Sequence, residues 1–246
     1  MIDNQELTQN RQTLEFSSHW MNAAGTLGFA PPAQWPLPEP PAAFVTNPIS
    51  YRPRKPAQGR TLKSFCGGFL LHTGLPSPGF REVIHKYAVR WARSSTPVWA
   101  HLLGDTPLHL ERMARQLEEM EGVAAIEVSF SHLAGGAEIL DGIRAVIGEL
   151  PLVLAVPLDC IRESWLAQAF RLGLAAVSIA PPRGSIVSET GAVIHGRLYG
   201  PALLPQSRDC LLYTSDAADD LLCVDLGGRR IIKKKKTTQR HNYSVK

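Results

Sequence analysis

Residues 98–128 read VWAHLLGDTPLHLERMARQLEEMEGVAAIEV, and they contain one complete repeat of the pattern that decides the fold. The apolar run at 98–102 predicts a buried strand, and Thr106 before Pro107 predicts the start of a helix. Apolar residues then recur every three or four positions until a glycine ends the helix. A second apolar run at 124–128 predicts the next strand. The stretch is therefore a strand, helix, strand unit.

The same alternation continues on both sides of this unit. An amphipathic helix is predicted at 80–93, a helix at 137–149, a strand at 152–156, a helix at 160–172 and a strand at 175–179. Apolar strands that alternate with amphipathic helices indicate βαβ units on a parallel sheet. This α/β pattern alone allows an eightfold barrel or an open, doubly wound sheet.

The N-terminal part predicts shorter elements. Residues 13–17 alternate as a strand does and are expected to plug one end of the sheet structure. Residues 20–29, WMNAAGTLGF, predict a short buried strand that ends in small residues, where the backbone can lie against a ligand. Six prolines between positions 31 and 41 predict an extended loop. A second strand is predicted at 43–46 and a small β-hairpin at 62–71.

Composition limits the function classes. The chain has 246 residues, of which 44% are hydrophobic, and this favours one globular domain with a substantial core. It has a polar N-terminus and no apolar run of about 18 residues, so we expect neither a signal peptide nor a membrane partner. Four cysteines without ligand spacing favour a cytoplasmic protein without a metal site.

The basic charge lies in the C-terminal segment. The net charge is +4, and residues 207–246 hold nine basic and five acidic residues, so residues 1–206 are neutral and predict no nucleic-acid partner. The run CLLYTSDAAD at 210–219 resembles a translated sequencing-library adapter, and the four lysines at 233–236 resemble a translated poly-A run. We therefore expect a domain at 1–206 and a non-native or disordered tail at 207–246.

Three motifs carry a resemblance to a known family. They are MNAAGTLGF at 21–29, GLPSPG at 74–79 and GRLYGPA at 196–202. In this order they resemble the dihydroorotate dehydrogenases, and the resemblance covers nearly all of residues 1–206. It implies a TIM-type (β/α)8 barrel, which usually needs about 250 residues. The expectation is therefore an incomplete barrel of about six strands, truncated at its C-terminal end, with the small N-terminal β-hairpin.

The resemblance also implies an activity. Members of the family use FMN to oxidise dihydroorotate to orotate in pyrimidine biosynthesis, with hydride passing to the flavin and a proton to a cysteine or serine base. It implies a small-molecule substrate held by Gly74 and Leu75, and it allows a homodimer. The motif at 21–29 and the corner at Gly200 are expected to face each other across the barrel mouth. The expected cofactor-binding residues are Ala24, Gly25, Thr26, Ser129 and Gly200.

Several polar positions depart from the family pattern. Asn47 and Ala155 stand where lysines are expected, and Phe130 stands at the position of the base. Together with Glu127, these changes move the pocket by about three charge units toward negative, which disfavours a reduced, anionic flavin. The remaining candidates for a catalytic role are Ser129, Ser131 and His132.

Three histidines, His72, His101 and His132, follow or end separate strands on the side where barrel active sites lie. They are interpreted either as acid/base groups or metal ligands of a rebuilt site, or as scattered loop histidines. Two other functions remain open: a noncatalytic barrel relative that binds a ligand or partner, and a truncated, inactive fragment.

Overall fold

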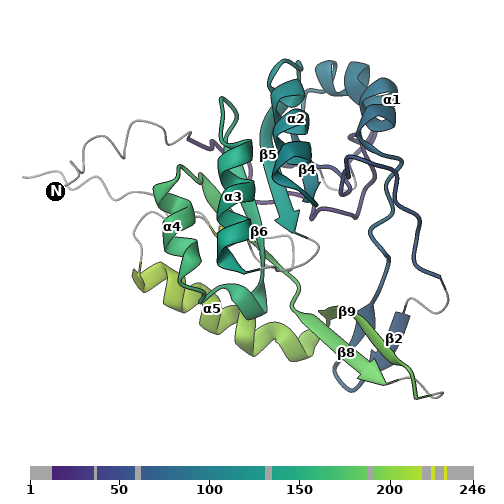
Figure 1. Cartoon of the computed structure of the whole chain (residues 1–246), viewed down its shortest axis with the longest axis vertical. Coiled ribbons are helices and arrows are strands. Elements are labelled where there is room, and N and C mark those ends of the chain that lie inside the picture. Colours follow the sequence, from purple (N-terminus) through teal and green to yellow (C-terminus); the bar gives the residue numbers. More distant parts are fainter. Residues whose placement is uncertain are drawn as a thin grey trace, which may run out of the picture.

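A computed structural model describes the chain at residues 13–35, 38–58, 62–130, 135–187, 191–217, 223–224 and 230–231. It has a large, mostly parallel sheet whose outer face is covered by helices, and a separate small sheet beside it (Figure 1). This is the α/β class that the strand and helix alternation predicts.

The large sheet is built from five parallel strands: β1 (Phe44–Val45), β4 (Val98–Gly104), β5 (Val123–Phe130), β6 (Leu152–Pro157) and β7 (Ala176–Ala180). They lie in the sheet in the order in which they occur in the chain. A doubly wound sheet reverses its strand order at a switch point, whereas a barrel does not. The sheet is therefore a curled half-barrel, and the prediction of an incomplete TIM-type barrel is confirmed.

Four helices connect these strands on the outer face: α1 (Phe80–Ala92), α2 (Pro107–Glu118), α3 (Gly136–Val146) and α4 (Trp165–Arg171). Thr106 is the N-cap of α2, as its position before a proline predicts, and its Oγ1 accepts a hydrogen bond of 3.2 Å from the backbone N–H of His109. The helix predicted at 160–172 is shorter than expected, because α4 begins only at Trp165, after a 3-10 turn at Leu158–Cys160 and irregular residues at 161–164. None of the helices that the structure describes is long and apolar enough to cross a membrane.

Strand alternation divides the apolar side chains between two cores. Every second residue of each strand faces the helices and joins the larger core, which includes Phe44, Leu102, Ile126 and Leu154. The other residues face the inside of the half-barrel. The inner core consists of Met21, Ala43, Val45, Trp99, Ala125, Val153 and Ala176.

The N-terminal segment covers this inner core. Leu14 and Phe16 pack against it, with the rings of Phe16 and Trp99 5.9 Å apart, so residues 13–17 plug the half-barrel as predicted. They do so without forming a strand. The strand predicted at 20–29 is also wrong beyond Trp20, because residues 24–27 form turns and bends.

A side chain takes the place of strand backbone at this edge of the sheet. The backbone N–H of Val45 donates to Oδ1 of Asn22 at 2.9 Å, and Nδ2 of Asn22 donates to the carbonyl of Val45 at 2.7 Å. Just before it, the N–H of Ala42 donates to the carbonyl of Trp20 at 2.9 Å. The edge of β1 is thus satisfied without another regular strand.

The small sheet joins two distant parts of the chain. Its order is β2 (Leu62–Phe65), β3 (Gly68–Leu71), β9 (Val193–Tyr199) and β8 (Arg183–Val187), all antiparallel. The hairpin predicted at 62–71 is confirmed as β2 and β3, whereas the second hairpin was not predicted. In Figure 1 this sheet lies at the lower right, away from α1 and α2.

The C-terminal part continues from the small sheet. A 3-10 turn at Pro201–Leu203 leads into α5 (Leu204–Ala217), so the expected domain boundary at residue 206 falls inside a helix. Ser207 and Cys210 on this helix are buried. Two short strands, β10 (Cys223–Val224) and β11 (Arg230–Ile231), extend the large sheet beyond β7.

Replacing Asn22 with alanine should lower the free energy of unfolding by about 1–3 kcal/mol, because it leaves a buried N–H and C=O of Val45 without their partner. Urea denaturation followed by circular dichroism measures the change. Thr26→Ala, which removes an exposed hydroxyl from the same segment, is the control and should change stability by no more than about 0.5 kcal/mol. Equal losses for the two variants would contradict the role of Asn22.

Candidate functional site

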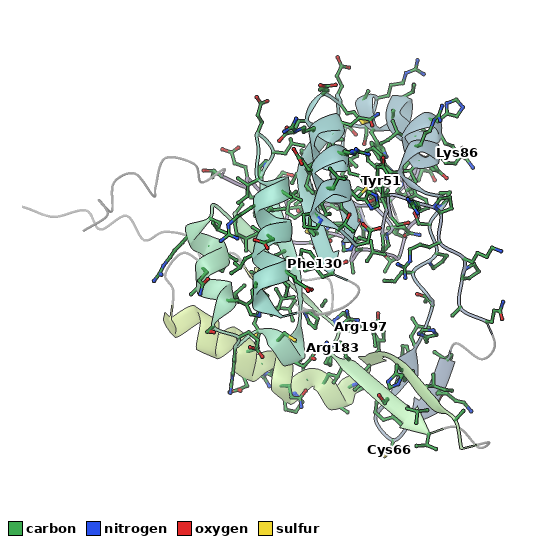
Figure 2. All side chains as sticks on the ribbon, viewed as in Figure 1. Tyr51, Cys66, Lys86, Phe130, Arg183 and Arg197 are labelled. Atoms are coloured by element: carbon green, nitrogen blue, oxygen red, sulfur yellow. The ribbon has the colours of Figure 1, made fainter. Side chains whose placement is uncertain are left out.

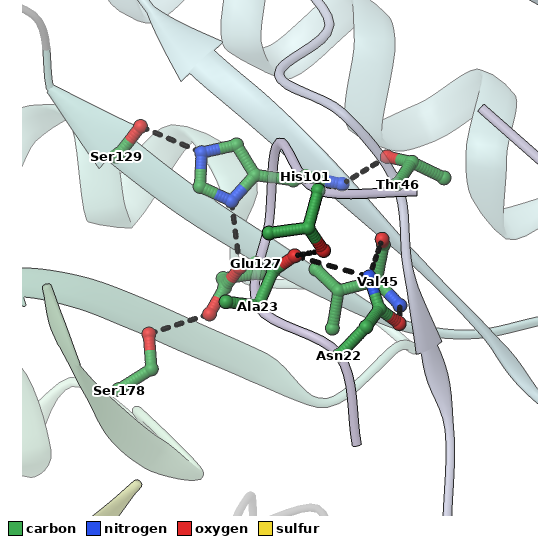
Figure 3. Close-up of polar contacts among 9 residues, drawn as sticks. Asn22, Ala23, Val45, Thr46, His101, Glu127, Ser129 and Ser178 are labelled. Carbon is green, nitrogen blue, oxygen red and sulfur yellow. Dashed lines mark hydrogen bonds and ion pairs between the residues drawn. The ribbon is translucent and has the colours of Figure 1, made fainter. Parts of the chain in front are cut away.

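A chain of polar side chains crosses the inner face of the half-barrel. His101 on β4 and Glu127 on β5 are paired in the sheet register, so both side chains point inward. Nδ1 of His101 lies 2.6 Å from Oε2 of Glu127, and Nε2 of His101 lies 2.7 Å from Oγ of Ser129. On β7, Ser178 donates to Oε1 of Glu127 at 2.5 Å (Figure 3). We call His101, Glu127, Ser129 and Ser178 the inner relay.

The charge states of Glu127 and His101 decide which atom carries each proton. With Glu127 ionised and His101 neutral, Nδ1 of His101 donates to Glu127 and Nε2 accepts the hydroxyl proton of Ser129. The backbone N–H of His101 donates to Oγ1 of Thr46 at 2.9 Å, which holds β4 at this point. A hydroxyl, an imidazole and a carboxylate in this order make the hydroxyl a better proton acceptor and nucleophile.

The members of the inner relay differ in how deeply they are buried. His101 is 4% exposed and Glu127 6% exposed, whereas Ser129 is half-buried. Buried in this way, the carboxylate and the imidazole each require a partner, and each provides one for the other. Ser129, at the carboxyl end of β5, is therefore the member of the relay that a substrate can reach.

The structure thus brings together several of the predicted candidates. Ser129, His101 and Glu127 were singled out from the sequence, and they form one hydrogen-bonded chain. Ser178 and Thr46 were missed, although their inward positions on neighbouring strands could have indicated them. Ser131 and His132 lie outside the described residues.

Phe130 points away from the inner relay. A Cβ built on Gly142 would lie 2.6 Å from the Phe130 ring, and one built on Gly104 would lie 2.9 Å from it. The ring therefore fills the space between β4 and α3, on the helix side of the sheet (Figure 2). At the position where the family pattern has its base, this chain has a packing residue.

The residues expected near a cofactor differ in their surroundings. The backbone N–H of Gly28 donates to Oδ1 of Asn47 at 3.1 Å, so Asn47 holds the N-terminal loop in place. In that loop, Oγ1 of Thr26 donates to the carbonyl of Ala23 at 2.6 Å. Gly25 has φ of 84°, and Ala24 packs against the inner core. Residues 24–26 therefore form a tight turn against the inner core.

Gly200 lies in another environment. A Cβ on this residue would lie 2.5 Å from Cα of Gly68 and 2.6 Å from the carbonyl oxygen of Gly67. Its φ of 129° also favours glycine. Gly200 thus packs on the β2–β3 turn in the small sheet.

Gly74 and Leu75 line a cavity of about 710 Å³ between the large and the small sheet. Gly74 has φ of 75°, and a Cβ there would lie 2.6 Å from the backbone N of Ala57, so a side chain is excluded. Leu75 has φ of 50°, the one positive φ among the described residues other than glycine. Such strained residues cluster at ligand sites.

An ion pair stands at the edge of this cavity. Nε of Arg183 donates to Oδ2 of Asp159 at 2.9 Å, and the backbone N–H of Arg183 donates to Oδ1 at 3.2 Å. Burial alone would raise the pKa of Asp159, but these bonds and the guanidinium charge outweigh it and hold the pKa below its ordinary value of 3.8. Burial also raises the pKa of the neighbouring Cys160 thiol.

No protein-family model matches the chain. A protein of Aeropyrum pernix assigned as dihydroorotate dehydrogenase A (fumarate) is 34% identical over 143 residues, which are 55% of this chain and 46% of that protein. The catalytic subunit of a dihydroorotate dehydrogenase B (NAD(+)) from Pelobacter propionicus is 32% identical over 127 residues, which are 51% of this chain and 42% of that protein.

The chain is a relative of the dihydroorotate dehydrogenases. A longer match, to the corresponding subunit of Thermococcus kodakarensis, is 25% identical over 197 residues and covers 76% of this chain and 63% of that protein. The chain spans less than half the length of the first two relatives.

The Arg183–Asp159 ion pair should make the free energy of unfolding depend on pH. Because the folded pKa of Asp159 is lowered, its contribution is complete above the ordinary value of 3.8 and is lost as the pH falls through the folded value. Asp159→Asn should therefore lose less stability than the unchanged chain on acidification. Thermal unfolding at neutral pH and below pH 3.8 measures this difference. Arg183→Gln, which removes the other half of the pair, should give the same flatter profile; a profile like that of the unchanged chain would contradict the assignment.

Proposed function

We propose that this chain belongs to an FMN-dependent oxidoreductase of the dihydroorotate dehydrogenase type, which removes a hydride and a proton from adjacent carbons of a small cyclic substrate such as dihydroorotate. The observation that carries the proposal is the inner relay, a proton-accepting group on a barrel related to these enzymes. The resemblance gives the reaction class, and the relay gives it a base.

The residues of the chain handle the proton. Ser129 takes it from the substrate carbon while its own hydroxyl proton moves to Nε2 of His101. Glu127 stabilises the imidazolium that forms, because its carboxylate already accepts from Nδ1. Ser178 keeps that carboxylate oriented. FMN, when bound, supplies the acceptor for the hydride.

The described residues fit a flavin in shape but not in charge. The turn at 24–26 has small side chains, and a Cβ on Gly25 would meet only Pro48 Cδ at 3.8 Å, so the backbone there leaves room for a ring edge. Ala24, Gly25 and Thr26 would contact it. Asn47 and Ala155 offer no cation, and Glu127 is an acid, so nothing among them offsets the charge of a reduced flavin.

The charge difference favours a second candidate. A noncatalytic barrel relative that binds a small ligand needs no cation for a reduced flavin. Such a protein also needs no base at position 130, where the Phe130 ring packs beside Gly104 and Gly142. A measurement of turnover distinguishes the oxidoreductase from the noncatalytic relative.

Ser129→Ala should lower the rate at which dihydroorotate bleaches the flavin absorbance of the FMN-loaded full chain by about 10²–10⁴-fold, because the proton acceptor is removed. His101→Gln should have a similar effect. Ser164→Ala, at an exposed position before α4, is the matched control and should leave the rate unchanged. Equal rates for Ser129→Ala and the unchanged chain would remove the base from the proposal, and absent turnover with retained ligand binding would favour the second candidate.

Ala155→Lys should strengthen the binding of reduced FMN relative to oxidised FMN by about tenfold or more, because it restores one cation near the proposed ring site. Anaerobic titration of both flavin forms, followed by absorbance, gives the ratio. Ala167→Lys, on the exposed side of α4, controls for added charge and should leave the ratio unchanged. The same change in both variants would contradict a flavin beside Ala155.

A further inference from the structure

The inner relay has the order of groups that activates a serine as a nucleophile. Oγ of Ser129 lies 2.7 Å from Nε2 of His101, and Nδ1 of the same ring lies 2.6 Å from the Glu127 carboxylate (Figure 3). A serine, a histidine and an acid in this arrangement recur on unrelated folds, where the imidazole takes the hydroxyl proton as the oxygen attacks a carbonyl carbon. The geometry thus suits covalent chemistry as well as the abstraction of a proton.

The imidazole and the acid of the relay are held in place from several sides. Oε1 of Glu127 accepts a hydrogen bond from Ser178, while Oε2 faces His101. The backbone N–H of His101 donates to Oγ1 of Thr46. Because both ring nitrogens and the backbone of His101 have partners, Ser129 meets an imidazole that is already oriented.

A second serine–histidine pair in the chain lacks such an acid. Oγ of Ser185 on β8 lies 2.7 Å from Nδ1 of His195 on β9, and among the described residues no carboxylate lies within ion-pair distance of His195. Ser185 is exposed, so reagents reach it more easily than the half-buried Ser129. Any higher reactivity of Ser129 therefore comes from its chemical surroundings and not from access.

The side chains beside Ser129 on the inner face are apolar. The sheet register pairs Ser129 with Leu103 on β4 and brings Ala155 of β6 to its other side. An acyl group with a negative charge of its own would lie near Glu127, and neither neighbour offers a cation to offset that charge. The surroundings therefore favour a short, uncharged acyl group.

We propose that Ser129 is a nucleophile that takes a short, uncharged acyl group from an activated ester, such as an aryl ester, and transfers it to water. Its oxygen bonds to the acyl carbon while its proton moves to Nε2 of His101. The bond from the acyl carbon to the leaving oxygen then breaks, and Nε2 returns the proton to that oxygen. Water next gives a proton to Nε2 and bonds to the acyl carbon. The free acid leaves, and Oγ of Ser129 regains its proton from Nε2.

Acyl transfer goes beyond the proposed function, because it requires neither flavin nor an electron acceptor. It is measured without FMN, whereas the oxidoreductase is measured by the bleaching of the flavin. Bleaching without acylation would leave Ser129 as a base only, and acylation without bleaching would leave the oxidoreductase without support. The two proposals therefore fail separately.

Diisopropyl fluorophosphate phosphorylates activated serines with loss of fluoride, so it identifies the nucleophile in the unchanged chain. The full chain is treated at neutral pH without FMN, and peptide mass spectrometry locates the modified residue. Ser129 should react faster than the exposed Ser185 by about 100-fold or more, because its imidazole is paired with an acid. Comparable rates at the two serines, or an unmodified Ser129, would overturn the proposal.

The release of nitrophenolate from p-nitrophenyl acetate measures turnover. Ser129→Ala and His101→Gln should each lower the rate by about 100-fold or more, and prior treatment with the fluorophosphate should abolish it. Ser185→Ala removes the hydroxyl of the other pair and should leave the rate unchanged. Thermal unfolding establishes that each variant is folded. A folded Ser129→Ala chain that hydrolyses the ester like the unchanged chain would overturn the proposal.

Glu127→Gln tests the acid, which is a positioning residue. It should lower the maximal rate by about tenfold or more and leave the ester concentration at half-maximal rate unchanged, because the amide does not stabilise the imidazolium. A variant that changes only the half-maximal concentration would contradict this role.

Mono-p-nitrophenyl succinate carries a carboxylate on its acyl group and tests the substrate class. After each rate is divided by that of the same ester with free imidazole, the succinate should react about tenfold or more slowly than the acetate. Equal relative rates would overturn the assignment of an uncharged acyl group.

Discussion

The requirement that a buried carboxylate has partners organises the inside of this half-barrel. Glu127 is almost completely covered, and it accepts from an imidazole on one neighbouring strand and from a hydroxyl on β7. These bonds tie β4, β5 and β7 together on a face that elsewhere is apolar. The same bonds fix the imidazole so that its second nitrogen meets Ser129. Packing and chemistry therefore depend on one set of contacts.

The inner relay and the cavity between the two sheets differ in their charge. The inner relay contains one acid and no lysine or arginine, whereas three arginines and one acid, Asp159, line the cavity between the sheets. The sheet registers keep them apart, because inward positions of β4 and β5 form the first and the hairpin of β8 and β9 forms much of the second.

Local chemistry made much of the fold predictable. Thr106 before Pro107 marks a helix start in any context, and the apolar runs at 98–102 and 152–156 predict buried parallel strands. Asn22 could not be predicted, because a side chain that replaces a strand has no local signal. The hairpin of β8 and β9 was missed because half-exposed residues such as Arg183 and Arg197 hide the apolar alternation. Ser129 and His101 were candidates from their places at strand ends, but their contact depends on the register between two strands.

The small sheet has a consequence for how the molecule folds. Its central strands, β3 and β9, are separated along the chain by the whole run of βα units, and each half is a marginal hairpin by itself. Contacts between such distant segments carry a large loop-closure cost until the intervening elements have collapsed. We therefore expect the β3–β9 pairing to form late, so that Arg54 and Arg197 come to share one cavity only when the chain has otherwise reached its native topology.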